Sequence, residues 1–86
     1  MAPRVLQRQE MKIACEEDVI VIRRTVQALA QQRGFDAFAT AAITTATSEL
    51  TRNVWVHARG GLAVLEELGD GARVGLRVQL RDDGPG

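Results

Sequence analysis

The chain has 86 residues, equal numbers of acidic and basic side chains, and a single cysteine. This length allows one domain with a small core. A lone Cys15 excludes an internal disulfide and is typical of a reducing cytoplasm. Scattered charges and an aromatic content of 3% argue against a nucleic-acid partner. No apolar run approaches the roughly 20 residues that cross a bilayer, so we expect a cytoplasmic domain with no membrane partner.

The first third of the chain predicts a strand followed by a helix. Residues 5–15 alternate in polarity, which predicts a strand with Ile13 and a small buried Cys15 on its inner side. The acidic residues 16–18 suit a helix N-terminus, and Gly34 suits the residue that follows a helix. The apolar positions between them have helical spacing and are Val19, Ile22, Val26 and Leu29.

A second helix is predicted over residues 37–59, with Asp36 as its N-cap. Its threonine-rich first half has poor helix propensity, so we expect packing on more than one side to hold it. We also expect the hydroxyl groups between Thr40 and Ser48 to donate back to carbonyls of the same helix.

Glu49 and Asn53 are the polar residues around which the second helix is organised. Residues four apart lie one above the other on a helix, about 40° apart around its axis. Because no charged side chain occurs between Ala37 and Ser48, this segment reads as buried. A buried carboxylate without a partner is costly, so the pair requires an explanation.

The last third of the chain predicts a β-hairpin. Residues 62–68 read as a strand, and Gly69-Asp70-Gly71 is a strong turn signal. Residues 74–80 then alternate in polarity, which predicts that their apolar side covers the helices. The same alternation places Asp82 on that inner side, at the end of the strand. A loop follows in which glycines permit close backbone approach.

These two polar groups of residues resemble the nucleotide site of the GHKL superfamily, the Bergerat-fold ATPases and kinases. The resemblance rests on Glu49-x-x-x-Asn53 and on the loop Asp82-Asp-Gly-Pro-Gly. Within that superfamily, the run Ala-Thr-Ser-Glu-Leu-Thr-Arg-Asn over residues 46–53 is most similar to the bacterial anti-sigma and switch-protein serine kinases of the RsbT type. The resemblance covers residues 11–86.

The resemblance implies a fold, a reaction and a set of roles. The fold would be α+β, a two-layer α/β sandwich of the Bergerat type. Asn53 would bind a Mg²⁺ ion that bridges the phosphates of ATP, and Glu49 would act as the general base. Asp82 would accept a hydrogen bond from the adenine amino group, with Gly84 and Gly86 as the glycines of its loop. The chain would then be an ATP-dependent serine/threonine kinase of a partner-switching module such as a stressosome. It would phosphorylate a STAS-domain antagonist protein and also bind a phosphatase or a sigma factor.

The family continues beyond this loop with a nucleotide lid and further strands, which these 86 residues do not contain. We therefore expect residues 1–86 to be a single partial domain that binds ATP and Mg²⁺ weakly or not at all. The alternative function is a non-catalytic module for protein binding or dimerisation. An uncovered strand over residues 74–80 would favour a homodimer or a strand-exchanged oligomer. A histidine-kinase ATPase fragment is disfavoured because such kinases usually carry Asn at the position of Glu49. Arg52 is open to two interpretations, a contact with phosphate or a partner, or a solvated or ion-paired side chain.

Overall fold

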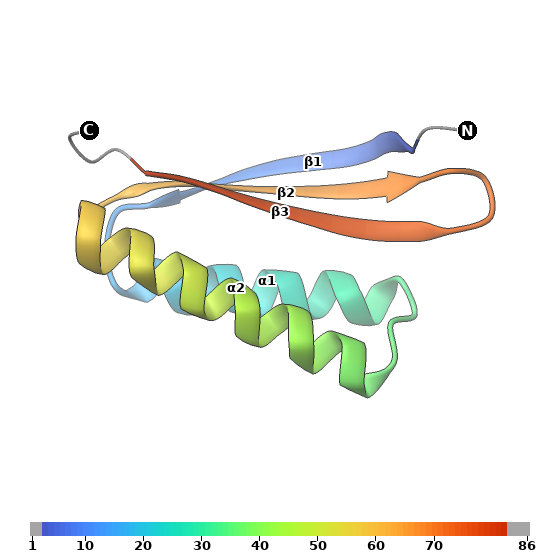
Figure 1. Cartoon of the computed structure of the whole chain (residues 1–86), viewed down its shortest axis with the longest axis horizontal. Coiled ribbons are helices and arrows are strands. Elements are labelled where there is room, and N and C mark those ends of the chain that lie inside the picture. Colours follow the sequence, from blue (N-terminus) through green and yellow to red (C-terminus); the bar gives the residue numbers. More distant parts are fainter. Residues whose placement is uncertain (1–2, 83–86) are drawn as a thin grey trace.

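The structure, a computed structural model, describes residues 3–82 and places a three-stranded sheet against two helices (Figure 1). Both helices cover the same face of the antiparallel sheet, whose strand order is β1-β2-β3. The predicted α+β class and the order strand-helix-helix-strand-strand are therefore confirmed. The elements are β1 (Arg4–Ile13), α1 (Glu17–Gln32), α2 (Ala37–Ala58), β2 (Gly61–Gly69) and β3 (Val74–Asp82).

Helix α1 buries the side predicted from its apolar spacing. Val19, Ile22 and Val26 are buried, and Ala30 completes this stripe where Leu29 was expected. Gly34 follows the helix with a φ of 82°, a left-handed conformation that glycine adopts without steric cost. A glycine at this position lets the chain reverse towards α2.

The link between β1 and α1 is held by one carboxylate. Asp18 Oδ2 accepts hydrogen bonds from the backbone N–H groups of Ala14 (2.7 Å) and Cys15 (3.1 Å). The bond from Ala14 is the main cause that lowers the pKa of Asp18. The prediction that Cys15 is buried is wrong, because β1 ends at Ile13 and leaves Cys15 exposed. The neighbouring Glu17 carboxylate raises the pKa of its thiol, so Cys15 is held in its less reactive, protonated form.

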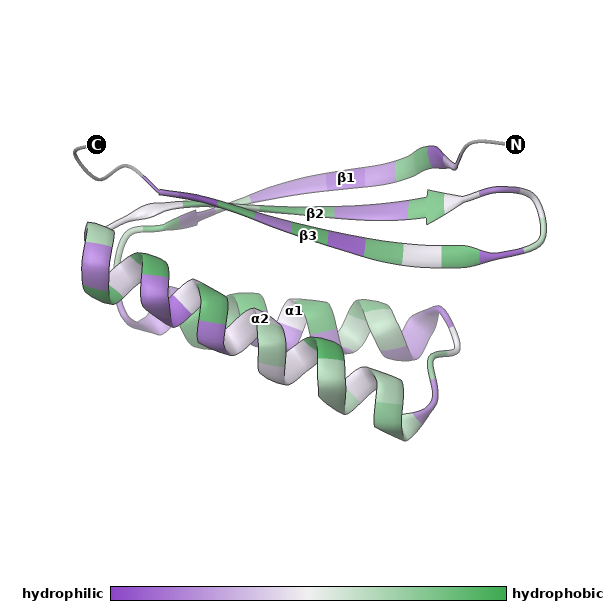
Figure 2. Ribbon diagram, viewed as in Figure 1, coloured by the Kyte–Doolittle hydropathy of each residue, from purple (hydrophilic) through white to green (hydrophobic). Residues whose placement is uncertain are grey.

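Helix α2 begins where predicted and ends one residue earlier. Asp36 caps it, since its Oδ1 accepts the N–H of Ala39 at 2.7 Å. Figure 2 shows that the first half of α2 is coloured apolar, whereas polar residues interrupt the second half. After Ala58, the cap residue Arg59 has a φ of 63° and donates its N–H to the carbonyl of Trp55 at 3.0 Å. A non-glycine residue thus occupies the left-handed cap position.

The core lies between the helices and the covered face of the sheet. Its buried centre is Ile13, Ile22 and Ala63, against which Met11, Val54, Trp55 and Leu80 pack. The alternation of β3 is confirmed for Leu76, Val78 and Leu80, which are half-buried and pair with β2 residues on this side. Val74, at the start of the strand, was expected on the covered side as well but is exposed. The predicted hairpin turn is closed by Asp70, which bonds Arg73 through both backbone and side chain. Within residues 3–82, neither helix combines the length and apolar character of a membrane span.

Candidate functional site

Helix α2 presents Glu49 and Asn53 on its outer side. Both residues are exposed, so the expectation that they lie in a buried segment is wrong. The buried face of α2 consists instead of Thr40, Thr47 and Thr51, which lie roughly opposite Glu49 around the axis, at about 100° per residue. Small threonines let the helix approach its neighbours without apolar residues. The carboxylate and the carboxamide are therefore solvated and available to a ligand.

The second half of the predicted site meets α2 at Gly61. A side chain at this glycine would lie 2.8 Å from Val54 Cγ1 and 3.0 Å from Asp82 Cα, and would collide with the carbonyl oxygen of Arg81. Gly61 also pairs with Asp82 in the β2–β3 register. This close approach places Asp82, on the helix side of the sheet, at the same end of the molecule as Asn53, the neighbour of Val54.

The loop that follows Asp82 completes the predicted nucleotide site. Gly84 and Gly86 lie outside the described residues, so their predicted role stays a prediction. Asp82 itself is exposed and has an interaction partner. The C-terminal half of α2 and the end of β3 therefore lie at the same end of the molecule, and the roles of the motif residues stay predictions.

The donor set at this end of the molecule suits a hard cation that is shared with a nucleotide. Among residues 3–82 no group of three or more His, Cys, Asp or Glu side chains is placed to hold a metal ion. A site built by protein carboxylates alone is thus not present in this part of the chain. Asn53 instead offers one exposed carboxamide oxygen, and Mg²⁺ accepts few protein ligands when phosphate oxygens and water supply the others.

The hydroxyl groups of α2 divide into two sets. Thr51 Oγ1 donates to the Thr47 carbonyl of the same helix at 2.7 Å. Thr40 Oγ1 donates at 3.4 Å to the carbonyl of Phe35, which precedes the helix, so the expectation of a bond within the helix is wrong for Thr40. The same expectation is wrong for Thr44 and Ser48, whose hydroxyl oxygens are buried and have no hydrogen-bond partner within residues 3–82. Both residues line a groove between α1 and α2.

The same groove contains two arginines that do not belong to the nucleotide motif. Arg23 and Arg24 of α1 face Glu49 and Arg52 of α2 across it. Their signal in the sequence was a pair of arginines that interrupts the apolar spacing of α1, but nothing in the sequence indicates which helix lies opposite. Asn53 does not line this groove. Helix α2 therefore has two functional sides, one that carries Asn53 and one that faces α1.

Comparison with known proteins identifies a related kinase. The chain is 36% identical over 76 residues to the serine/threonine-protein kinase RsbT of Bacillus subtilis (strain 168), a match that covers 88% of this chain. The chain spans 57% of the length of that relative. The similarity to RsbT-type kinases that the motifs indicate is thus confirmed. No family model and no solved structure matches the chain, and the Bergerat assignment of the fold stays a prediction.

Proposed function

We propose that this chain is the nucleotide-binding part of a switch-protein serine/threonine kinase of the GHKL superfamily. The similarity to RsbT supports this proposal, and one structural observation carries it. Val54, the neighbour of Asn53, and Asp82 both lie close to Gly61, which supports a site that combines α2 with the end of β3. The full site would form from α2, the end of β3 and the loop after it. Residues 1–86 would form one domain that acts in the cytoplasm, where ATP is supplied.

In this proposal each polar residue has one task. Asn53 holds Mg²⁺ beside the nucleotide phosphates, and the ion neutralises charge on the phosphates when it is bound. Glu49, one turn earlier, accepts the proton of the attacking hydroxyl group. Asp82 accepts a hydrogen bond from the adenine amino group, while Gly84 and Gly86 let the following loop approach the nucleotide.

The substrate we propose is a serine or threonine of a STAS-domain antagonist protein in a bacterial partner-switching module. A phosphatase or a sigma factor would be a further partner, as in the stressosome and anti-sigma systems that the resemblance implies. The exposed position of Glu49 on α2 supports a protein substrate, because a hydroxyl on another molecule can approach it directly.

A nucleotide titration followed by NMR tests this proposal, since it detects even weak binding. We expect Mg-ATP to shift the side-chain amide signal of Asn53 and the backbone signals near Asp82. Asn53→Ala should abolish the dependence on Mg²⁺, and Asp82→Ala should remove the preference for ATP over GTP. Gln79→Ala, which removes a carboxamide from the helix-free side of β3, is the matched control and should change neither.

The kinase activity is tested separately by transfer of the γ-phosphate to a STAS-domain protein. Glu49→Gln should lower kcat about 10²–10⁴-fold, the usual contribution of a general base, with little change in nucleotide affinity. If Mg-ATP produces no shift at Asn53 or Asp82, the nucleotide site is wrong. If nucleotide binds without phosphoryl transfer, the second candidate below is favoured.

The second candidate is a non-catalytic module that binds a partner protein or a second copy of the chain. Several large apolar side chains support it by being exposed on the helices, namely Ile20, Val21, Phe38, Leu50 and Val56. Strands β1 and β3 are also the two edges of the sheet, and unpaired edges favour association with another strand. A homodimer or strand-exchanged oligomer would appear in light scattering at micromolar concentration, whereas a monomeric mass would contradict it.

A further inference from the structure

The groove between α1 and α2 has a chemistry that the proposed nucleotide site does not use. It has a volume of about 470 Å³, and its cationic residues are Arg23 and Arg24 on α1 and Arg52 on α2. Glu49 is the acidic residue that lines it, so these four side chains carry a net charge of +2. A groove with this charge favours an anion.

None of the three arginines has a carboxylate partner in the described part of the chain. The ion pairs formed among residues 3–82 connect other arginines with Glu10, Glu66 and Glu67. Arg23, Arg24 and Arg52 are exposed, and each guanidinium presents several N–H donors in a planar arrangement that suits phosphate oxygens. Three such groups around one groove thus form a set of donors that lacks an acceptor.

Two hydroxyl groups in the groove lack a partner as well. The Thr44 and Ser48 oxygens are inaccessible to solvent and form no hydrogen bond within residues 3–82, although other threonines of the two helices donate to carbonyls. A buried polar group without a partner destabilises a fold unless a ligand or water satisfies it. Because these two oxygens have no accessible surface, a ligand in the groove contacts the arginines and not the hydroxyls.

We propose that the groove between α1 and α2 binds a phosphate group, with Arg23, Arg24 and Arg52 as its charged donors. Phosphate offers enough oxygen acceptors for all three guanidinium groups. Glu49 lies about 100° around α2 from Ser48, so its carboxylate reaches the groove from the rim and leaves the base to the anion. The phosphate is either free in solution or attached to a side chain of another protein.

This site borders the proposed nucleotide site and shares Glu49 with it, but it does not include Asn53 or Asp82. Successive helix residues are about 100° apart, so Asn53 is turned away from Arg52 and from the groove. The proposal needs no kinase activity and does not depend on the similarity to RsbT. Binding of phosphate without binding of Mg-ATP would support this site while contradicting the proposed function, and the reverse result would contradict this site alone.

The test is a titration of the ¹⁵N-labelled chain with inorganic phosphate at constant ionic strength, observed at the arginine Nε–H signals. We expect the signals of Arg23, Arg24 and Arg52 to shift saturably, while that of the exposed Arg4 on β1 stays in place. The variant Arg24→Gln/Arg52→Gln should weaken binding at least about tenfold, because two charge-assisted hydrogen bonds are lost. Arg4→Gln is the matched control and should bind as the unchanged chain does.

A second variant tests the hydroxyl groups without changing the charge. Thr44→Val/Ser48→Ala should leave phosphate binding unchanged and raise Tm in phosphate-free buffer, because it removes two unsatisfied buried groups. A loss of phosphate binding in this variant would show that the arginines do not form the site, which contradicts the proposal.

A short phosphoserine peptide and its unphosphorylated form distinguish the two sources of phosphate. Binding of the phosphopeptide about tenfold tighter than inorganic phosphate identifies a phosphorylated protein as the ligand, whereas equal affinity identifies the free anion. The proposal is overturned if neither anion shifts the three arginine signals, if Arg4 shifts equally, or if the Arg24→Gln/Arg52→Gln variant binds phosphate unchanged.

Discussion

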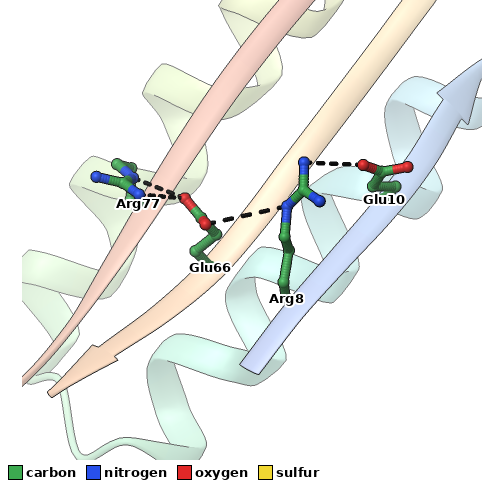
Figure 3. A network of polar contacts seen from close by, with 4 residues as sticks. All are labelled: Arg8, Glu10, Glu66 and Arg77. Atoms are coloured by element: carbon green, nitrogen blue, oxygen red, sulfur yellow. Dashed lines mark hydrogen bonds and ion pairs between the residues drawn. The ribbon is translucent and has the colours of Figure 1, made fainter. Parts of the chain in front are cut away.

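Each face of the sheet contains a buried carboxylate from β2, and the two carboxylates are paired with arginines from different elements. Glu67 points to the helices with its side chain 3% exposed and pairs with Arg33, at the end of α1. Glu66 points to the opposite face, 8% exposed, between Arg77 at 2.7 Å and Arg8 at 4.0 Å. Figure 3 shows Glu66 between these two arginines from the neighbouring strands, with Glu10 beyond Arg8.

The two ion pairs differ in what they connect: one joins a helix to the sheet, and the other joins neighbouring strands. The Arg33–Glu67 pair ties a helix end to the sheet, whereas the Glu66 cluster connects three strands that are already hydrogen-bonded. The face that the helices leave uncovered also contains a fully buried apolar residue, Val64. Its register partners are Glu10 and Gln79. Long polar side chains can cover apolar surface with their aliphatic parts, and they replace a second helix layer here.

The largest predicted effect is expected at Gly61, where the covered face of the sheet lies close to α2. Gly61→Ala should lower the free energy of unfolding by about 3 kcal/mol, because overpacking of this size forces backbone shifts. The new methyl group would meet Val54 at 2.8 Å and the β3 backbone. Urea unfolding followed by circular dichroism measures the loss. If this close contact also aligns α2 with Asp82, Mg-ATP shifts at Asn53 should weaken in the same variant.

The control for this prediction lies on the other side of the sheet. Apart from its chain neighbours, no atom of residues 3–82 lies within 4 Å of the position that a side chain at Gly75 would take. Gly75 pairs with Leu68, on the uncovered face. Gly75→Ala should therefore change the free energy of unfolding by less than about 1 kcal/mol. Equal losses for the two alanine variants would show that strand propensity, and not the contact with α2, determines the effect.

The second prediction removes Arg33, the partner of Glu67 within residues 3–82. Arg33→Met should cost about 2–3 kcal/mol, because it leaves a buried carboxylate without a counter-charge. Adding Glu67→Leu should recover most of that loss, since an apolar pair replaces the ion pair without an unsatisfied group. The four proteins of this double-mutant cycle are compared by urea unfolding. A double variant as unstable as Arg33→Met would mean that packing of Arg33 matters more than its charge.

Local sequence patterns predicted the helices and strands well, but they did not predict which residues distant in the sequence lie in contact. The alternation of β3 gave the correct inner side for Leu76, Val78 and Leu80, because it depends on backbone geometry alone. Asp36 and Gly34 were correct for the same reason, since caps are formed by neighbouring residues. The prediction that Glu49 is buried failed because a charge-free run was taken for a buried one, whereas threonines form the inner face of α2.

The buried glutamates show where a stronger inference was possible. Adjacent strand residues point to opposite faces, so one of Glu66 and Glu67 had to face the helices and required a cation there. The sequence contains that signal, but not the identity of the cation. Arg33 lies 34 positions away from Glu67, and its approach depends on how α1 ends. The same holds for Gly61, whose need for a glycine arises from the position of α2.

The smallest predicted effect tests whether Arg8 can replace Arg77 as the partner of Glu66 on the uncovered face of the sheet. Arg77→Met should cost about 0.5–1 kcal/mol, because Arg8 remains beside Glu66 and both arginine side chains are about half exposed. This loss should also shrink in 1 M NaCl, where the screening length falls to about 3 Å. The loss for Arg33→Met should change less with salt, because Glu67 is nearly inaccessible to solvent. If Arg77→Met proved as costly as Arg33→Met at low salt, Arg8 would not compensate, and the two faces would hold their carboxylates equally rigidly.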